Sequence, residues 1–317
     1  MNATLIIAFF GSFLLSVLVT PLVKKIAIKQ DILDRPEKAP DRKIHKKPIP
    51  LLGGLAIFIA FNIVLLIIAQ NITEGYLLNK HLWGIFFGGL IIMIGGFIDD
   101  KYDIKPAYQL IFPILASIVV VASGIGIDYV TNPLGGEFRL DNIKFTLFSI
   151  GNLPYQIVIL ADLFSLLWLM AMMYTTKILD GVDGLVTGLT TIGAFIIFFL
   201  SMTKDVYQPE TAALALILAG ACLGFFLFNF NPAKIFLGEG GSLYCGFMLG
   251  VLSIISGGKI ATALLIMGIP MIDVVWTIIR RLFFEKKSFT QADRKHLHHR
   301  LLDIGLSPKK TLLLFLG

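Results

Sequence analysis

Repeated long apolar runs are the feature that most constrains what this chain can fold into. They lie at about 4–23, 52–70, 83–98, 108–126, 155–176, 185–202, 210–228, 243–256 and 260–279. Most approach the roughly 20 residues that an α-helix needs to cross a bilayer. Hydrophobic residues make up 56% of the 317, which is more apolar surface than one soluble core can hide. The sequence therefore predicts an all-α polytopic membrane protein, with residues 1–317 as a single domain.

The two ends of the chain complete a predicted set of about ten transmembrane helices. No lysine or arginine precedes the first run, and Lys24 and Lys25 follow it, so it is expected to be an anchor and not a cleaved signal. A further apolar run opens at Thr311, and the tenth helix is expected to be incomplete here. Cys222 and Cys245 lie in or beside apolar runs without metal-ligand spacing and are expected to be buried thiols.

Positive charges give an orientation to these helices. The connections 24–47 and 280–310 each carry nine lysines and arginines, and with the three connections that alternate between them they hold 22 of the 27. Cytoplasmic loops of membrane proteins carry this excess. The N-terminus is therefore expected outside an inner membrane, and the net charge of +6 needs no nucleic-acid partner. The outside connection 127–154 reads as a small structural hairpin.

The chemically rich motifs fall on the predicted cytoplasmic side. They are "DRKIHKKPIPLLGG", "GFIDDKYDIK", "KILDGVDGL", "FNFNPAKIFLGEGGS" and "RKHLHHRLLDIG". A transporter should instead have polar sites near the middle of the membrane and two repeated halves. No repeat is visible, and Asp162 and Asp273 are the only acids expected in mid-span. An enzyme that works at the inner membrane surface is favoured over a transporter.

Carboxylates beside glycines and cationic side chains suit phosphoryl transfer. Acids can hold a divalent cation, glycine lets the backbone approach phosphate oxygens, and lysine or arginine neutralises the remaining charge. The histidines near Arg300 could bind a metal, transfer protons or hydrogen-bond a substrate. No cysteine lies near them, so anion or sugar recognition is favoured over zinc.

These five motifs, in this order and spacing, resemble the polyprenyl-phosphate N-acetylhexosamine-1-phosphate transferase family over nearly the whole chain. The resemblance implies transfer of a sugar-1-phosphate from a UDP-sugar to undecaprenyl phosphate, with release of UMP, as the first membrane step of cell-envelope polysaccharide synthesis. The last motif resembles the branch that uses UDP-N-acetylglucosamine. Mg²⁺, with Mn²⁺ as an alternative, is the implied cofactor, and a homodimer in the bilayer is a further expectation.

The resemblance also implies roles for the acids. Asp99 and Asp100 match the paired aspartates that handle the lipid phosphate. Asp180 and Asp183 match the catalytic acids near the nucleotide and the metal. Glu239 stands where the family usually has a magnesium-binding aspartate. Glu239 and Asp180 are therefore the implied metal ligands.

A second group of residues is expected to bind substrate. Phe236 matches an aromatic residue that stacks on uracil, and the histidine motif matches a loop that recognises the diphosphate and the sugar. The expected binding residues are Arg42, Lys43, His45, Lys177, Gly181, Phe236, His296, His298, His299 and Arg300.

Five positions depart from the family pattern: Leu51, Gln109, Tyr174, Lys177 and Glu239. A homologue that binds nucleotide or lipid without catalysis is therefore an alternative. The positive charge of Lys177 would oppose a nearby divalent cation. Lys177 is expected to pair with Glu239 in the empty site, and Mg²⁺ to bind poorly without nucleotide.

Overall fold

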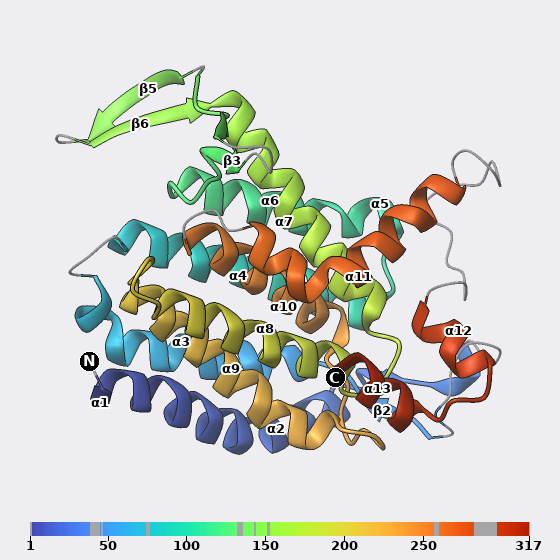
Figure 1. Ribbon diagram of the computed structural model, residues 1–317. Coiled ribbons are helices and arrows are strands. Elements are labelled where there is room, and N and C mark those ends of the chain that lie inside the picture. Colours follow the sequence, from blue (N-terminus) through green and yellow to red (C-terminus); the bar gives the residue numbers. More distant parts are fainter. Residues whose placement is uncertain are drawn as a thin grey trace.

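A computed structural model describes residues 2–38, 45, 47–73, 77–131, 136–142, 144–150, 153–256, 260–281 and 297–316. This part of the chain is mostly helical (Figure 1). The helices are α1 Asn2–Ile6, α2 Ser12–Lys29, α3 Gly53–Ile72, α4 Asn79–Tyr102, α5 Pro106–Gln109, α6 Ile111–Ala122, α7 Ile159–Leu179, α8 Leu185–Ser201, α9 Pro209–Asn229, α10 Gly238–Ile255, α11 Ile260–Ile279, α12 Leu297–Asp303 and α13 Pro308–Leu316. A π-helical turn, η1 Ile7–Gly11, joins α1 to α2, and a 3₁₀ turn, η2, covers Pro36–Lys38.

Six helical segments in the described part are long and apolar enough to cross a membrane. They are Ala3–Lys29, α3, α4, α7, α9 and α10. Three shorter apolar helices lie at Pro106–Ala122, Leu185–Ser201 and Met267–Thr277. Each predicted apolar window overlaps a helix, so the prediction of a helical polytopic membrane protein is confirmed.

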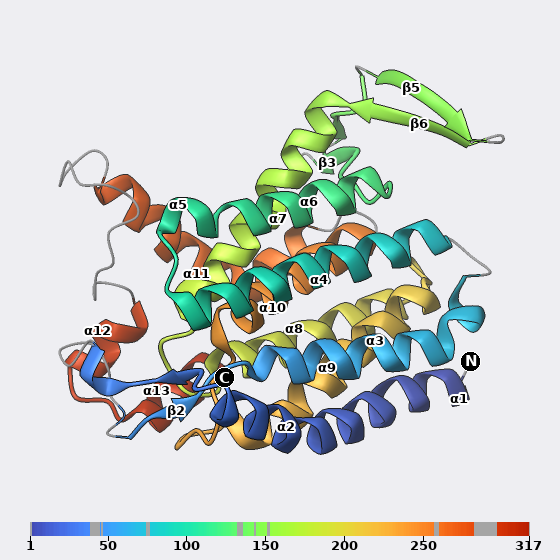
Figure 2. The same ribbon diagram turned by 180° about the vertical axis from the view of Figure 1, so that it is seen from behind.

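Two helices, α9 and α10, form the centre of the bundle. α9 packs against α2, α3 and α8, while α10 packs against α3, α4 and α7 (Figures 1 and 2). Cys222 on α9 and Cys245 on α10 are buried free thiols, as predicted.

Glycine pairs bring α3 and α4 against the first turn of α10. A Cβ added at Gly54 would lie 2.0 Å from the Cα of Gly241, and one at Gly96 would lie 2.1 Å from the backbone nitrogen of Gly240. No real side chain tolerates such distances, so these crossings require glycine. The "GEGGS" stretch is therefore held between two other helices.

The strands lie at the two ends of the bundle. β1 Leu33–Asp34 and β2 Ile49–Pro50 form one antiparallel pair near α12 and α13. At the opposite end of the bundle, β3 Tyr129–Thr131 pairs with β4 Glu137–Arg139, and β5 Lys144–Ile150 pairs with β6 Leu153–Val158 (Figure 1). The N-terminus lies at this same end, on the other side of the bundle.

This second end differs from the predicted single hairpin and from the predicted helix over 155–176. Two ribbons are present, and β6 continues to Val158, so α7 begins only at Ile159. Asp162 then lies in the first turn of α7, where a carboxylate oxygen accepts a hydrogen bond from the Val158 amide at 2.9 Å. The expectation that Asp162 lies in mid-span is therefore wrong, and its charge is explained by its position at a helix start.

Candidate active site

The segment before α10 is fixed by hydrogen bonds to the segment before α3. The amide of Phe236 donates to the carbonyl of Pro50 at 2.8 Å, and the amides of Gly53 and Gly54 donate back to the carbonyls of Phe236 and Leu237 at 2.9 and 2.8 Å. The first and fourth motifs of the sequence thus form one structural unit.

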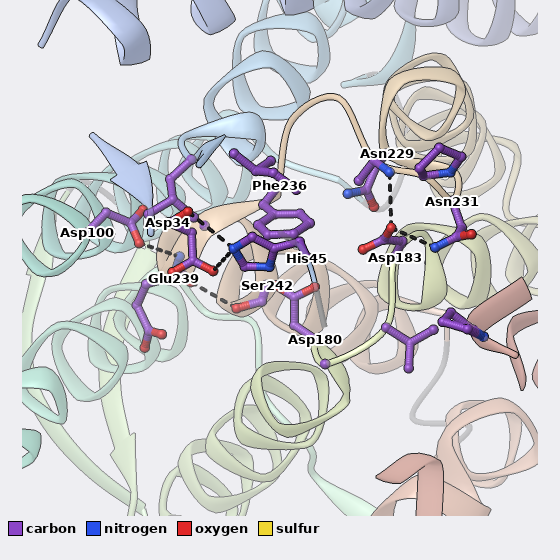
Figure 3. Close-up of a pocket in the computed structure, with 18 of the residues that line it drawn as sticks. Asp34, His45, Asp100, Asp180, Asp183, Asn229, Asn231, Phe236, Glu239 and Ser242 are labelled. Atoms are coloured by element: carbon purple, nitrogen blue, oxygen red, sulfur yellow. Dashed lines mark hydrogen bonds and ion pairs between the residues drawn. The ribbon is translucent and has the colours of Figure 1, made fainter. Parts of the chain in front are cut away.

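A cavity of about 640 Å³ opens beside this unit, at the end of the bundle that carries β2 and α13. The volume is in the range of small-molecule sites. Its acidic and basic lining residues among those described are Asp34, His45, Asp100, Lys177, Asp180, Asp183 and Glu239. Figure 3 shows Asp183 and Asn231 on one side and Asp100 and Glu239 on the other, with Phe236 and His45 between them.

The turn after α7 contributes two acids to this lining. The Asp183 carboxylate accepts hydrogen bonds from the Asn231 side chain at 2.9 Å and from the Ala233 amide at 3.0 Å. Asn229 accepts from the Gly184 amide at 3.1 Å and donates to the Ile235 carbonyl at 3.0 Å. The "DGVDG" turn is therefore locked to the "FNFNP" segment.

Asn229 and Asn231 line the cavity but were not predicted as site residues. The signal was present in the sequence, because two amides flank a phenylalanine and precede a proline. Such a pattern is also typical of an ordinary turn. Only their contacts with Asp183 and Gly184 reveal the function of the two side chains, which is to hold the acidic turn in place.

Asp180 follows the last residue of α7 and lies at the cavity wall. Surrounding protein atoms, and then the charges of Glu239 and Asp183, raise the pKa of Asp180 to about 8. Its surface remains accessible from the cavity, so water there moderates this increase in pKa. A carboxylate in this environment is stabilised by a bound cation.

The paired aspartates at the end of α4 point to different places. Asp100 lines the cavity and accepts a hydrogen bond from the Glu239 amide at 3.0 Å. Gly238, at a φ of 75°, leaves the space that this carboxylate needs, because a Cβ there would lie 2.4 Å from Asp100 Oδ2.

Asp99 instead accepts from the Ile104 amide at 3.1 Å and from the Gln109 side chain at 2.9 Å. It is not among the described lining residues of the cavity. The structure therefore brings Asp100 to the predicted site and places Asp99 behind it.

Lys177 forms the ion pair with Glu239 that the sequence predicted. Its ammonium also donates to the Gln109 carbonyl oxygen at 2.9 Å and lies 5.5 Å from the centre of the Tyr174 ring. Four of the five positions that depart from the family pattern thus meet in one place. Leu51, the fifth, lines the same cavity.

His45 and Phe236 form an aromatic corner of the cavity. Their ring centres lie 5.3 Å apart at an interplanar angle of 76°. His45 Nε2 lies 3.3 Å from the Asp34 carbonyl oxygen and 3.5 Å from an Asp34 carboxylate oxygen. Phe236 is half-buried and faces the cavity, as a base-stacking residue requires.

The remaining predicted binding residues are placed only in part. Arg42, Lys43 and His296 lie outside the described residues. His298 and His299 belong to α12, and their side chains are outside the description. Arg300 is exposed on α12 and is not among the described lining residues, whereas Gly181 is.

The donor set suits a divalent cation in kind, since carboxylate oxygens are the ligands that Mg²⁺ prefers. Among the described residues, however, no three His, Cys, Asp or Glu side chains already form a metal-binding group. Burial and the charges of Glu239 and Asp183 disfavour the negative charge of Asp180, so a cation would stabilise this carboxylate, whereas Glu239 is already paired with Lys177.

Comparisons with known proteins decide the family. The model of glycosyl transferase family 4 matches residues 82–257, which is more than half of the chain. The chain belongs to this family. The resemblance stated from the five motifs is therefore confirmed.

Individual relatives match nearly the whole of this chain. The chain is 31% identical to the probable undecaprenyl-phosphate N-acetylglucosaminyl 1-phosphate transferase of Bacillus subtilis, over 98% of this chain and 80% of that protein. It is also 31% identical to the undecaprenyl-phosphate alpha-N-acetylglucosaminyl 1-phosphate transferase of Pasteurella multocida, over 99% and 82%. Identity to the phospho-N-acetylmuramoyl-pentapeptide-transferase of Clostridium beijerinckii is 28%, over 99% and 91%.

Proposed function

We propose that this family 4 member transfers N-acetylglucosamine-1-phosphate from UDP-N-acetylglucosamine to undecaprenyl phosphate and releases UMP. The observation that carries the proposal is one cavity in which Asp100, Asp180, Asp183 and Glu239 surround an aromatic corner at the end of a membrane bundle. The two N-acetylglucosaminyl transferases named above support this sugar over the muramoyl-pentapeptide substrate.

In the proposed reaction an oxygen of the lipid phosphate attacks the sugar-linked phosphorus of the UDP-sugar. The new phosphorus–oxygen bond joins lipid to sugar phosphate, and the bond between the two phosphates of the nucleotide breaks. UMP leaves with the electron pair of that bond. Reactions of this type depend mainly on positioning and on neutralising phosphate charge.

Residues of the cavity supply these two requirements. Phe236, beside His45 in the cavity wall, would stack on the uracil, and Asn231 donates a hydrogen bond that orients the Asp183 carboxylate. Asp180 and Glu239 are the residues that would hold Mg²⁺, which would neutralise the phosphates and stabilise the leaving UMP. Asp100 faces the same space and would position the attacking lipid phosphate.

A second cavity supports a lipid acceptor. It has a volume of about 240 Å³ and an almost entirely apolar lining from α3, α4, α10 and the residues just before α3 and α10, including Phe58, Met93 and Leu237. Asp100 lines both cavities. An isoprenoid chain in the apolar cavity would bring its phosphate to Asp100, so the two cavities suit the two ends of the acceptor.

The proposed topology follows from the same arrangement. An outside N-terminus with a cytoplasmic site is supported by the position of the cavity and the N-terminus at opposite ends of the bundle (Figures 1 and 2). The proposed number of spans, about ten, rests on the apolar runs of the sequence. UDP-sugars are made in the cytoplasm, so the proposed donor would meet the cavity from that side.

The proposal is tested with purified protein in lipid nanodiscs, undecaprenyl phosphate, Mg²⁺ and a panel of UDP-sugars. UMP release with UDP-N-acetylglucosamine, dependent on the lipid phosphate, is the expected result. UMP release with no member of the panel, together with retained nucleotide binding, would support the non-catalytic alternative. The Lys177–Glu239 pair is the observation that keeps this alternative in view.

A further inference from the structure

Four helices contribute to one network of polar contacts, which runs from the cavity wall to Asp99 behind it. Glu239 of α10 pairs with Lys177 of α7. The Lys177 ammonium donates to the carbonyl oxygen of Gln109 on α5 at 2.9 Å. The amide nitrogen of Gln109 donates to Asp99 of α4 at 2.9 Å. The network thus joins a cavity acid to an acid that lies behind the cavity.

The direction of the contacts in this network is fixed. Gln109 donates its amide nitrogen both to Asp99 and to the Ile104 carbonyl, the latter at 3.1 Å. Because the amide nitrogen faces Asp99 and Ile104, the carbonyl oxygen of Gln109 faces Lys177. This oxygen can only accept a hydrogen bond, and the ammonium donates it. The ammonium is largely enclosed, with 23% of the Lys177 side chain and 16% of the Glu239 side chain exposed. Lys177 is held in the site and does not extend into solvent.

The positive charge of Lys177 is important because of the acids around it. Five carboxylates line the cavity, and Lys177 is the one lysine or arginine among its described lining residues. Coulomb attraction in a partly enclosed site is stronger than in water. A cation fixed to one of these carboxylates must weaken the attraction of that carboxylate for any second cation.

We propose that the Lys177 ammonium is a built-in cation of this site, whose ion pair with Glu239 keeps this carboxylate from binding a divalent metal. When a nucleotide sugar binds, its phosphates replace Glu239 as the partner of the ammonium. This inference rests on the proposed function, because it assigns the ligand of Lys177 as the diphosphate of that substrate. In the empty cavity the ammonium neutralises Glu239. With substrate bound, the ammonium contacts phosphate oxygens, and Glu239 becomes available to the metal.

Two properties follow from this arrangement. The empty protein binds a divalent ion weakly, since the ion must displace or tolerate the ammonium. The nucleotide sugar binds measurably without any metal, since a lysine already provides positive charge for its phosphates. Both properties are lost when the ammonium is removed.

The first property is measured by titrating metal-free protein with Mn²⁺ and following free Mn²⁺ by electron paramagnetic resonance, without nucleotide. Lys177→Asn should bind Mn²⁺ at least about tenfold more tightly than the unaltered protein, which corresponds to 1.4 kcal/mol. Lys101→Asn is the matched control, because it makes the same change at an exposed lysine of α4 that does not line the cavity. It should leave the Mn²⁺ affinity unchanged.

The second property is measured by calorimetric titration of UDP-N-acetylglucosamine in EDTA. The unaltered protein and Lys101→Asn should bind it, and Lys177→Asn should bind it at least about tenfold more weakly, again 1.4 kcal/mol. If Lys177→Asn destabilises the fold because Glu239 is left unpaired, the double variant Lys177→Asn with Glu239→Asp is used in place of the single variant. This variant retains a shorter carboxylate without the ammonium.

The two titrations separate this inference from the proposed function. Equal Mn²⁺ affinity of the unaltered protein and both Lys177 variants would overturn the inference. Equal metal-free affinity of these proteins for the nucleotide sugar would also overturn it. Failure of the unaltered protein to bind any UDP-sugar, with or without metal, would instead overturn the proposed function, and the nucleotide-free Mn²⁺ titration would still decide whether Lys177 withholds Glu239.

Discussion

At the scale of single residues, Phe236 tests the nucleotide half of the cavity. An aromatic residue that stacks on a base contributes about 1–3 kcal/mol. Phe236→Ala should therefore raise the KM for the UDP-sugar roughly tenfold, with a smaller effect on the KM for the lipid phosphate. Steady-state kinetics with each substrate varied in turn measures both values. Equal increases in the two values would show that Phe236 contributes packing and not stacking.

The paired aspartates should respond differently to the same substitution. Asp100 faces both cavities, whereas Asp99 accepts hydrogen bonds from Ile104 and Gln109 behind them. Asp100→Asn should lower kcat by about 10²–10⁴, a range common for groups that assist proton transfer or charge stabilisation. Asp99→Asn should lower thermal stability and change kcat much less. A larger loss of kcat in Asp99→Asn would contradict the observed orientation of the two side chains.

Asp180 gives the site a dependence on pH. Burial, and then the charges of Glu239 and Asp183, raise its pKa from the ordinary value of 3.8 towards about 8, and cavity water moderates the increase, so the folded protein binds this proton more tightly than the unfolded chain. The resulting stability is fully present below the ordinary pKa and is lost as pH rises through about 8. Between pH 6 and pH 9, in EDTA and without substrate, the unaltered protein should therefore lose more thermal stability than Asp180→Asn. Asp205→Asn, at an exposed aspartate, is the control. Parallel curves for the unaltered protein and Asp180→Asn would show that water in the cavity cancels the effect.

At the scale of helices, the contact between α4 and α10 sets the position of Glu239. Gly96→Ala would place a Cβ 2.1 Å from the Gly240 nitrogen, so the two helices would have to separate. We expect a lower melting temperature, by up to about 2 °C for each kcal/mol lost in a chain of this size. Gly268→Ala on α11 is the matched control, because nothing lies within 4 Å of a Cβ there. Equal melting temperatures of the two variants would mean that α4 and α10 adapt without cost.

The elements also show what could be predicted from sequence. Long apolar runs predicted the helices, since their length and composition alone suffice. The start of α7 was placed too early, because the apolar residues of "PYQIV" suit a strand as well as a helix, and their pairing with β5 decides between them. Periodicity within one segment cannot reveal a partner strand.

The site could likewise be predicted from the sequence only in part. Acids and glycines identified the correct motifs, because few structural roles require them at the end of an apolar run. The separation of Asp99 from the cavity was not predictable, since it depends on the Ile104 amide and the Gln109 side chain. The pairing of Lys177 with Glu239 was predicted from the positions that the family resemblance gives the two residues and from their opposite charges, and the ion pair is confirmed.

At the scale of the whole molecule, the acidic cavity and the longer β-ribbons lie at opposite ends of the helical bundle. The strands β3 to β6 and the N-terminus lie at one end, and the described acids of the cavity lie at the other (Figures 1 and 2). An apolar cavity between α3, α4 and α10 meets the acidic cavity at Asp100. In the proposed reaction, this arrangement would bring a water-soluble nucleotide sugar and a membrane lipid to the same carboxylate.

The most direct measurement of the proposed reaction follows the phosphorus next to the sugar. UDP-N-acetylglucosamine labelled with ³²P in that phosphate is incubated with the purified protein, undecaprenyl phosphate and Mg²⁺, and the lipid and aqueous phases are separated. The proposed reaction predicts that the label enters the lipid phase together with the sugar, and that unlabelled UMP appears in equal amount. Label that remains in the aqueous phase while the sugar enters the lipid, or no lipid product with any UDP-sugar, would contradict it.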